Sequence, residues 1–205
     1  MDYMKDTLSS EWEVTDLEEP HKIISIKVMC TDNSISISQQ KYIENFLHKE
    51  DMQDVNSAAI PIDPNIKLAP NLDNNELDHS NSYAKLLGCL QFISNSTRPD
   101  ISYAVNKLTA YTANLGLQHH SAIKWILRNL AGMKTLGITY PNTPNETDNN
   151  NLFHGYADAT FAKADNHKST TGYVFLGSRG VIMWKSKKHT MIVLSSMEAE
   201  YVALS

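Results

Sequence analysis

The sequence predicts a fold of mixed α+β and α/β class in two parts, and three observations support this division. Apolar residues recur at helical spacing between residues 82 and 131, which indicates a helical region. Alternating and β-branched runs precede and follow this region, which indicates strands on both sides of it. Residues 141–151 are Asn, Thr, Pro, Asp and Glu, which can bury no apolar surface. We therefore expect one domain at 1–140, a linker at 141–151 and a second domain at 152–205.

The first part is expected to open with a helix and a β-hairpin. The helix is predicted from the helical spacing of Met1, Met4, Leu8 and Trp12. The apolar runs 23–28 and 35–38, separated by turn residues, predict the hairpin. Ser38 is placed to cap a helix through Leu47, whose apolar face comprises Tyr42, Ile43, Phe46 and Leu47.

A long loop and three helices are expected next. Residues 60–82 form the loop, because Pro61, Pro64 and Pro70 exclude a long helix or a central strand. The helices are predicted at about 82–95, 100–112 and 119–131. Asp100 is placed to cap the second helix, and Gly132 suits the C-terminal cap of the third.

The second part is expected to be a sheet with a terminal helix. Strands are predicted at Leu152–Thr160, Gly172–Leu176 and Val181–Lys185. A shorter run, Thr190–Leu194, is either paired or merely extended. Ser195 or Ser196 can cap a final helix that begins near Met197.

Composition limits the compartment and the partners. The two cysteines, and the absence of an apolar run long enough for a signal peptide or a membrane span, predict an intracellular protein with no disulfide and no membrane partner. Each cysteine is expected to be a small buried hydrophobe. The net charge of −5 does not favour nucleic acid, but cations gather between Lys163 and His189, where Asp165 is the one acidic residue. Any nucleic-acid surface is therefore expected there.

Acidic residues in the second part suggest a metal site. Asp158 lies in a predicted strand, and Glu198 and Glu200 lie at the start of the terminal helix. Carboxylates brought together from a strand and a helix can hold Mg²⁺, and paired metals can cleave a phosphodiester. Spacing alone leaves the alternative open that these are ordinary turn and helix-dipole residues.

Motifs in the second part resemble the ribonuclease H domain of copia-type retrotransposons. Four of them occur in the order of that domain: Gly155-Tyr156-Ala157-Asp158-Ala159, Lys168-Ser169-Thr170-Thr171-Gly172-Tyr173-Val174-Phe175, Trp184-Lys185-Ser186-Lys187-Lys188 and Leu194-Ser195-Ser196-Met197-Glu198-Ala199-Glu200-Tyr201-Val202-Ala203-Leu204. The resemblance implies that 152–205 is a truncated ribonuclease H-like mixed sheet with a terminal helix.

The first part resembles the reverse transcriptase of the same elements, beyond its catalytic Asp pair. The matching segments are Thr15-Asp16-Leu17, Ile37-Ser38-Gln39-Gln40-Lys41-Tyr42, Leu87-Gly88 and Thr97-Arg98-Pro99-Asp100-Ile101-Ser102-Tyr103-Ala104-Val105. The resemblance implies that 1–140 holds the end of the palm, a primer-grip-like hairpin and thumb-like helices. Where the family has Leu-Gly in that hairpin, this chain has Ile24-Ser25, and a side chain would crowd a close backbone contact.

The resemblance also implies a ligand set for Mg²⁺. Asp158 matches the first ribonuclease H ligand and Glu200 the second, because Ala203 follows Glu200 at the family's spacing; Glu198 is the alternative. Two further Asp ligands would lie beyond Ser205, and the polymerase Asp pair is also missing. The intact parent is implied to copy RNA into DNA and to cleave RNA in RNA–DNA hybrids, within virus-like particles in the cytoplasm or in the nucleus. This chain alone is expected to be inactive, and a non-enzymatic remnant or binding module is the alternative.

The implied partners are an RNA–DNA hybrid or a primer–template. Basic side chains are expected to touch their phosphates, although solvated helix faces are an equally good interpretation for the helical ones. The candidates are Arg98, Lys107, Lys124, Arg128, Lys185, Lys187 and Lys188. His119 and His120 are expected to pack or cap and not to bind a metal, because adjacent residues on a helix face apart.

Overall fold

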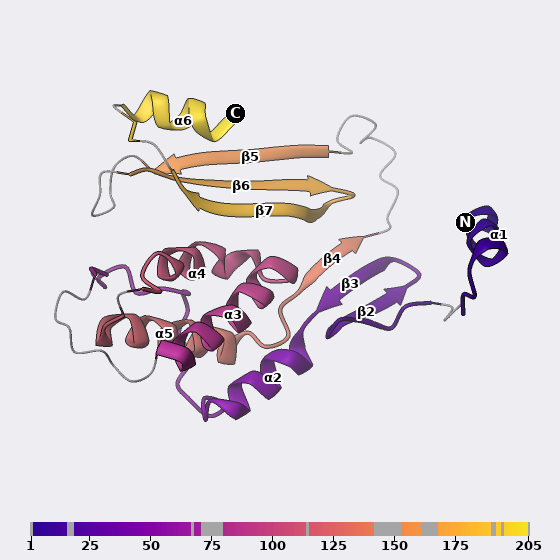
Figure 1. Ribbon diagram of the computed structural model, residues 1–205, viewed down its shortest axis with the longest axis horizontal. Helices are drawn as coiled ribbons and strands as arrows, with labels where there is room; N and C mark the ends of the chain where they lie inside the picture. Colours follow the sequence, from indigo (N-terminus) through magenta and orange to yellow (C-terminus); the bar gives the residue numbers. More distant parts are fainter. Residues whose placement is uncertain are drawn as a thin grey trace.

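The computed structural model shows an α+β protein in which one sheet lies against a group of helices and the other sheet lies beside the same helices (Figure 1). It describes residues 2–15, 19–66, 68–70, 80–113, 115–141, 153–160, 168–189, 192–193 and 195–204. The first helix, α1 (Asp2–Glu11), stands apart from the rest of the fold at the N-terminal end (Figure 1). Its helical form agrees with the sequence prediction, and Met4 and Leu8 are exposed.

The first sheet is antiparallel and contains the predicted hairpin. Its strands, in spatial order, are β1 (Lys22–Ile23), β2 (Ile26–Thr31), β3 (Ser34–Ser38) and β4 (Ile138–Pro141). Strand β4 was not predicted, and it arrives from a distant part of the chain to pair Ile138 with Ile37. Between β1 and β2, Ile24 and Ser25 have φ angles of 44° and 65°, in the left-handed region that favours glycine.

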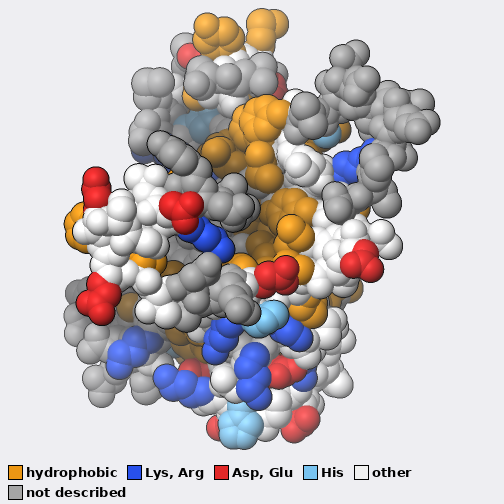
Figure 2. Space-filling view, turned by 90° about the vertical axis from the view of Figure 1, so that its right-hand side faces the viewer, with side chains coloured by type: hydrophobic (Ala, Val, Ile, Leu, Met, Phe, Trp, Pro, Cys, Tyr) orange, Lys and Arg blue, Asp and Glu red, His pale blue; other side chains and the backbone are white. Residues whose placement is uncertain are grey.

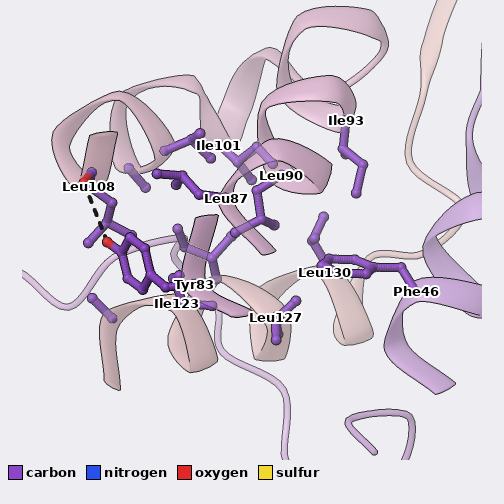
Figure 3. Packing of buried hydrophobic residues seen from close by; sticks show 14 of the residues in the cluster. Phe46, Tyr83, Leu87, Leu90, Ile93, Ile101, Leu108, Ile123, Leu127 and Leu130 are labelled. Atoms are coloured by element: carbon purple, nitrogen blue, oxygen red, sulfur yellow. Dashed lines mark hydrogen bonds between the residues drawn. The ribbon is translucent and has the colours of Figure 1, made fainter. Parts of the chain in front are cut away.

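The helical layer follows the predicted order of helices. It consists of α2 (Gln40–Lys49), α3 (Ser80–Ser96), the short 3₁₀ helix η1 (Pro99–Ile101), α4 (Ser102–Thr109) and α5 (Leu117–Gly132). The predicted apolar face of α2 is confirmed, with Ile43, Phe46 and Leu47 buried. Figure 3 shows how the facing side chains of these helices fill one core. The buried Tyr83 hydroxyl donates to the carbonyl of Leu108 (3.4 Å) and so joins α3 to α4.

Three predicted helix caps are wrong, each because the residue has another role. Ser38 ends β3, where it pairs with Lys27, and Gln39 takes the N-cap position of α2. Asp100 lies inside η1 and binds the Arg98 guanidinium instead of a helix N-terminus. Gly132 is the last residue of α5, and the C-cap is Met133.

The second sheet is antiparallel throughout the described strands, where a mixed sheet was expected. Strands β5 (Phe153–Thr160), β6 (Thr170–Gly177) and β7 (Gly180–Lys188) pair in chain order. Consecutive strands joined by hairpins must run antiparallel, and Ser178 and Arg179 make the β6–β7 turn with positive φ. Helix α6 (Ser196–Leu204) packs on β5 and β6. In the run 190–194, Ile192 and Val193 belong to no strand, and the rest lies outside the described residues.

Strand β7 joins the second sheet to the rest of the protein. The Trp184 indole N–H donates to the Ser94 carbonyl of α3 (2.8 Å), and the Tyr140 hydroxyl of β4 donates to the Val181 carbonyl (2.8 Å). A Cβ on Gly180 would lie 2.2 Å from the Tyr140 ring, so β4 and β7 approach closely here. Pro141 belongs to β4, whereas the remainder of the expected linker, 142–151, lies outside the described residues.

The two cysteines are less buried than the sequence predicts. Cys30 is exposed on β2 and Cys89 is half-buried on α3, so neither is a fully buried hydrophobe.

In the view of Figure 2, hydrophobic side chains gather in a band on one face, and Lys and Arg side chains gather below it. Charge is therefore unevenly distributed over this face. Within the described part of the chain, no helix has the length and hydropathy needed to cross a membrane.

Candidate functional site

Asp158 lies near the end of β5, an edge strand of the second sheet, and points toward the helical layer. Trp184 faces that layer, because its indole bonds to Ser94. Val174 pairs with Trp184, and Tyr156 pairs with Val174. Directly paired residues share a face of the sheet, and so do residues two apart in a strand. Asp158 therefore lies on the face of Trp184, and its side chain is exposed there.

Asp158 lines a cleft of about 380 Å³ between the second sheet and the helical layer, which we call the aspartate cleft. Asp100 and Tyr103 line it from η1 and α4, and Ser186 lines it from β7. Gly172 is the partner of Asp158 on β6, and a Cβ there would meet open space. The Asp100 oxygens already accept from Arg98, so the cleft presents the Asp158 carboxylate to a cation, and carboxylates are ligands that Mg²⁺ prefers.

The predicted phosphate contact of Arg98 is wrong in this structure. The Arg98 side chain is fully buried. Its Nε and Nη2 donate to the two carboxylate oxygens of Asp100 (2.8 and 2.7 Å), and its Nη1 donates to the Met133 carbonyl (2.9 Å). The guanidinium therefore joins η1 to the end of α5, and no phosphate could reach it without opening the core.

The glutamates of α6 lie away from the aspartate cleft. Ser195 caps α6 as predicted, since its Oγ accepts from the Glu198 amide (3.1 Å). Ala199 is fully buried, and Glu198 and Glu200 are exposed. At 3.6 residues per turn these two glutamates flank the buried stripe on opposite sides, so the helix itself favours neither. Neither is among the described residues that line the aspartate cleft, and an ion shared with Asp158 stays a prediction.

No group of three or more His, Cys, Asp or Glu side chains suited to a metal ion occurs among the described residues. The predicted site uses two carboxylates, and this finding does not bear on it. His119 has the predicted packing and capping role: it is fully buried, and its Nδ1 accepts from the Gly116 amide (2.9 Å) at the start of α5. Burial lowers the pKa of His119 below 6.5, and the neighbouring His120 adds to this shift.

A second cleft, of about 680 Å³, collects lysines between α4 and the second sheet, and we call it the lysine cleft. Four lysines line it: Lys107, Lys168, Lys187 and Lys188. The cleft is also lined by Ile66 and Leu68, from the loop before α3, and by hydroxyl residues of α4, β5 and β6. No carboxylate occurs among its described lining residues. Three of the seven predicted basic contacts therefore come together here.

The other predicted basic residues are dispersed. Lys185 is exposed and lines the aspartate cleft, and Lys124 is exposed on α5. Arg128 donates from Nε to the Asn56 carbonyl (2.7 Å) and lies 5.0 Å from the centre of the Trp125 ring. Arg128 thus holds the loop after α2 against α5, which is a structural role.

Tyr103 was not predicted as a site residue, and Lys168 was predicted only as part of the cationic segment 163–189. Tyr103 lines both clefts, and Lys168 precedes β6. The spacing of Tyr103 and Lys107, one helical turn apart, could have indicated a shared face of α4. Nothing in the spacing of Lys168 could have placed it beside α4, because that contact depends on how the sheet docks.

The chain is similar to Pol polyproteins of plant transposons. It is 32% identical to the retrovirus-related Pol polyprotein from transposon TNT 1-94 of Nicotiana tabacum, over 98% of this chain and 15% of that protein. It is 35% identical to the retrovirus-related Pol polyprotein from transposon RE1 of Arabidopsis thaliana, over 96% of this chain and 13% of that protein. It is also 33% identical to secreted RxLR effector protein 161 of Plasmopara viticola, over 60% of this chain and 84% of that protein.

No model of a protein family matches the chain, and no solved structure matches it. The chain spans 15% and 13% of the lengths of the two Pol polyproteins. Both matches nevertheless run over nearly all of this chain, in agreement with the family that its motifs indicate. The chain belongs to the retrovirus-related Pol polyproteins of copia-type retrotransposons.

Proposed function

We propose that the chain is the part of a copia-type Pol polyprotein that joins the end of its reverse transcriptase to its ribonuclease H. In the intact parent this region would take part in copying RNA into DNA and in cleaving the RNA of the RNA–DNA hybrid. The two halves would be the first sheet with the helical layer, and the second sheet with α6. The chain by itself is expected neither to extend a primer nor to cleave efficiently.

The observation that carries the proposal is the arrangement around Asp158. An exposed Asp in the first of three antiparallel strands is followed by a Ser-capped helix that bears Glu198 and Glu200. This is the order of elements that the motifs imply for a ribonuclease H. The Asp158 carboxylate suits a hard divalent cation. When bound, Mg²⁺ would activate water and stabilise the leaving oxygen; Asp158 is the cleft residue that would hold it, and Glu200 is the second ligand that the motifs imply.

Mn²⁺ in place of Mg²⁺ tests the metal site directly. Mn²⁺ is paramagnetic and broadens the amide NMR signals of nearby residues, so a shared ion should broaden those of Asp158 and of Glu200 or Glu198. Asp158→Asn should remove the broadening at both places, whereas Asp54→Asn, a matched change of an exposed carboxylate, should leave it intact. Broadening around Asp158 that leaves α6 untouched would refute the shared ion and keep Asp158 as a lone ligand.

Binding to nucleic acid tests the wider proposal. The chain should bind an RNA–DNA hybrid with an affinity that falls as salt rises, because lysines would displace counterions from the phosphates. A chain that shows no measurable affinity for the hybrid at low salt would contradict a role on this substrate. Primer extension above a heat-killed control would contradict the expectation that this chain alone does not extend a primer.

A non-enzymatic remnant is the second candidate, and two observations favour it. The match to the RxLR effector covers most of that protein, so similar sequence occurs in a much shorter protein than a Pol polyprotein. Ser25, with φ of 65°, also stands where the family has Gly. The flanking genomic sequence separates the candidates: an open frame with an upstream Tyr-Val-Asp-Asp-like motif and a downstream Asp supports the enzyme, and stop codons on both sides support the remnant.

A further inference from the structure

We propose that the lysine cleft binds a single-stranded segment of nucleic acid, with the lysines on its phosphates and Tyr103 against a base. The inference rests on the proposed function, since it takes nucleic acid as the partner, and it adds the form of the strand and the residues that receive it. The cleft lies between α4 and the second sheet, and each side supplies part of it.

The charge of the cleft calls for an anion. Lys107 comes from α4, Lys168 from the segment before β6, and Lys187 and Lys188 from the end of β7. These four ammonium groups line one cleft in a protein whose net charge is −5. Since no described carboxylate lines the cleft, the lysines have no counter-charge within its described wall. Cationic clefts of this kind concentrate anions from solution.

Tyr103 gives the cleft a second means of recognition. Its side chain is 48% exposed and lines the lysine cleft and the aspartate cleft. The Lys107 ammonium lies 6.0 Å from the centre of its ring, so an aromatic face and a cation stand side by side on α4. Proteins that bind single strands combine these two features, because bases stack on aromatic rings while cations follow the backbone.

The size of the cleft favours a single strand over a duplex. Its volume of about 680 Å³ lies within the range of sites for small ligands, about 300–1,000 Å³. One or two nucleotides can enter such a space. A duplex keeps its bases stacked inside the helix and would meet only the rim, where Tyr103 could not reach a base.

Fluorescence anisotropy with labelled oligo(dT) tests the proposal. The double variant Lys107→Gln/Lys188→Gln should reduce the slope of log K against log salt by about 1.4, which is about 0.7 for each phosphate contact on a single strand. Tyr103→Ala should weaken binding by about 5- to 150-fold, and Tyr103→Phe should bind like the parent chain, because the ring can still stack.

The matched control is Lys41→Gln/Lys49→Gln, which removes the same charge from exposed positions of α2. Equal losses in the cleft and control variants would overturn the proposal, as would AMP that binds as tightly as oligo(dT). Hybrid binding separates this inference from the proposed function. Oligo(dT) binding that is the same in cleft and control variants, with hybrid binding intact, refutes the cleft alone. Failure of every protein to bind the hybrid, while oligo(dT) binding still depends on the cleft, refutes the hybrid role alone.

Discussion

Substitution of Arg98 should lower the free energy of unfolding without a direct effect on nucleic-acid binding. Arg98→Met removes a fully buried guanidinium that makes three hydrogen bonds, and it leaves the Asp100 carboxylate without its ion-pair partner. Breaking a buried ion pair costs about 3–5 kcal/mol. The Asp100 side chain is 34% exposed, so water compensates part of its charge, and we expect a loss near the lower end, about 3 kcal/mol.

Arg98→Lys separates the structural role from a phosphate contact. An ammonium keeps the charge but cannot serve both Asp100 oxygens and the Met133 carbonyl, so a loss of about 2 kcal/mol is expected. Urea unfolding followed by circular dichroism should show a midpoint lowered by about 1 M for Arg98→Lys, with an unchanged slope. The control Lys124→Met, on the exposed face of α5, should stay within about 0.5 kcal/mol of the parent chain. A stable Arg98→Lys protein that binds the hybrid less tightly would show that Arg98 does contact phosphates.

Three further predictions concern single residues. Ser25→Gly should raise the stability by about 0.5–1 kcal/mol, because Gly adopts its φ of 65° without strain, whereas Ser36→Gly within β3 should lower it; thermal unfolding measures both. The free energy of unfolding should be at its full value above pH 6.5 and fall below it, because the folded pKa of buried His119 is lowered and the unfolded chain therefore takes up the proton more readily. His119→Gln should flatten that fall, which urea midpoints measured at a series of pH values would show. Trp184→Phe should cost about 1 kcal/mol through loss of the bond to Ser94, and a second unfolding transition in the variant would show that this bond couples the sheet to the helical layer.

The regular elements of the fold could be predicted because each depends on a local pattern. The helices at 80–96, 102–109 and 117–132 lie close to their predicted ranges, since apolar spacing determines which face is buried. The caps failed because their residues are used over longer distances. Asp100, for example, pairs with Arg98, and Ser38 is required by the ladder with β2. Strand β4 escaped prediction because its partner, β3, lies about a hundred residues earlier in the chain.

In the candidate site, too, the features that depend on neighbouring residues could be predicted, and those that depend on distant contacts could not. Ser195 as a cap and His119 as a buried capping residue follow from their immediate neighbours, and both are confirmed. Arg98 has the side chain of a typical phosphate ligand, and only its burial and its ion pair with Asp100 show that it has a structural role. The lysine cleft depends on the docking of the second sheet against α4, so no local pattern could assemble it.

Because Tyr140 contacts the strand after the β6–β7 turn, the orientation of the second sheet does not depend on the length of the segment 142–152. Tyr140 precedes residues 142–152, and Val181, which accepts its hydroxyl, follows them, so the contact fixes the second sheet whatever the length of chain between. Doubling a loop costs only about 0.6 kcal/mol. Insertions between 142 and 152 should therefore be tolerated in natural relatives and in engineered fusions. Position 180 has no such latitude, because any side chain there would strike the Tyr140 ring and turn one half of the molecule against the other.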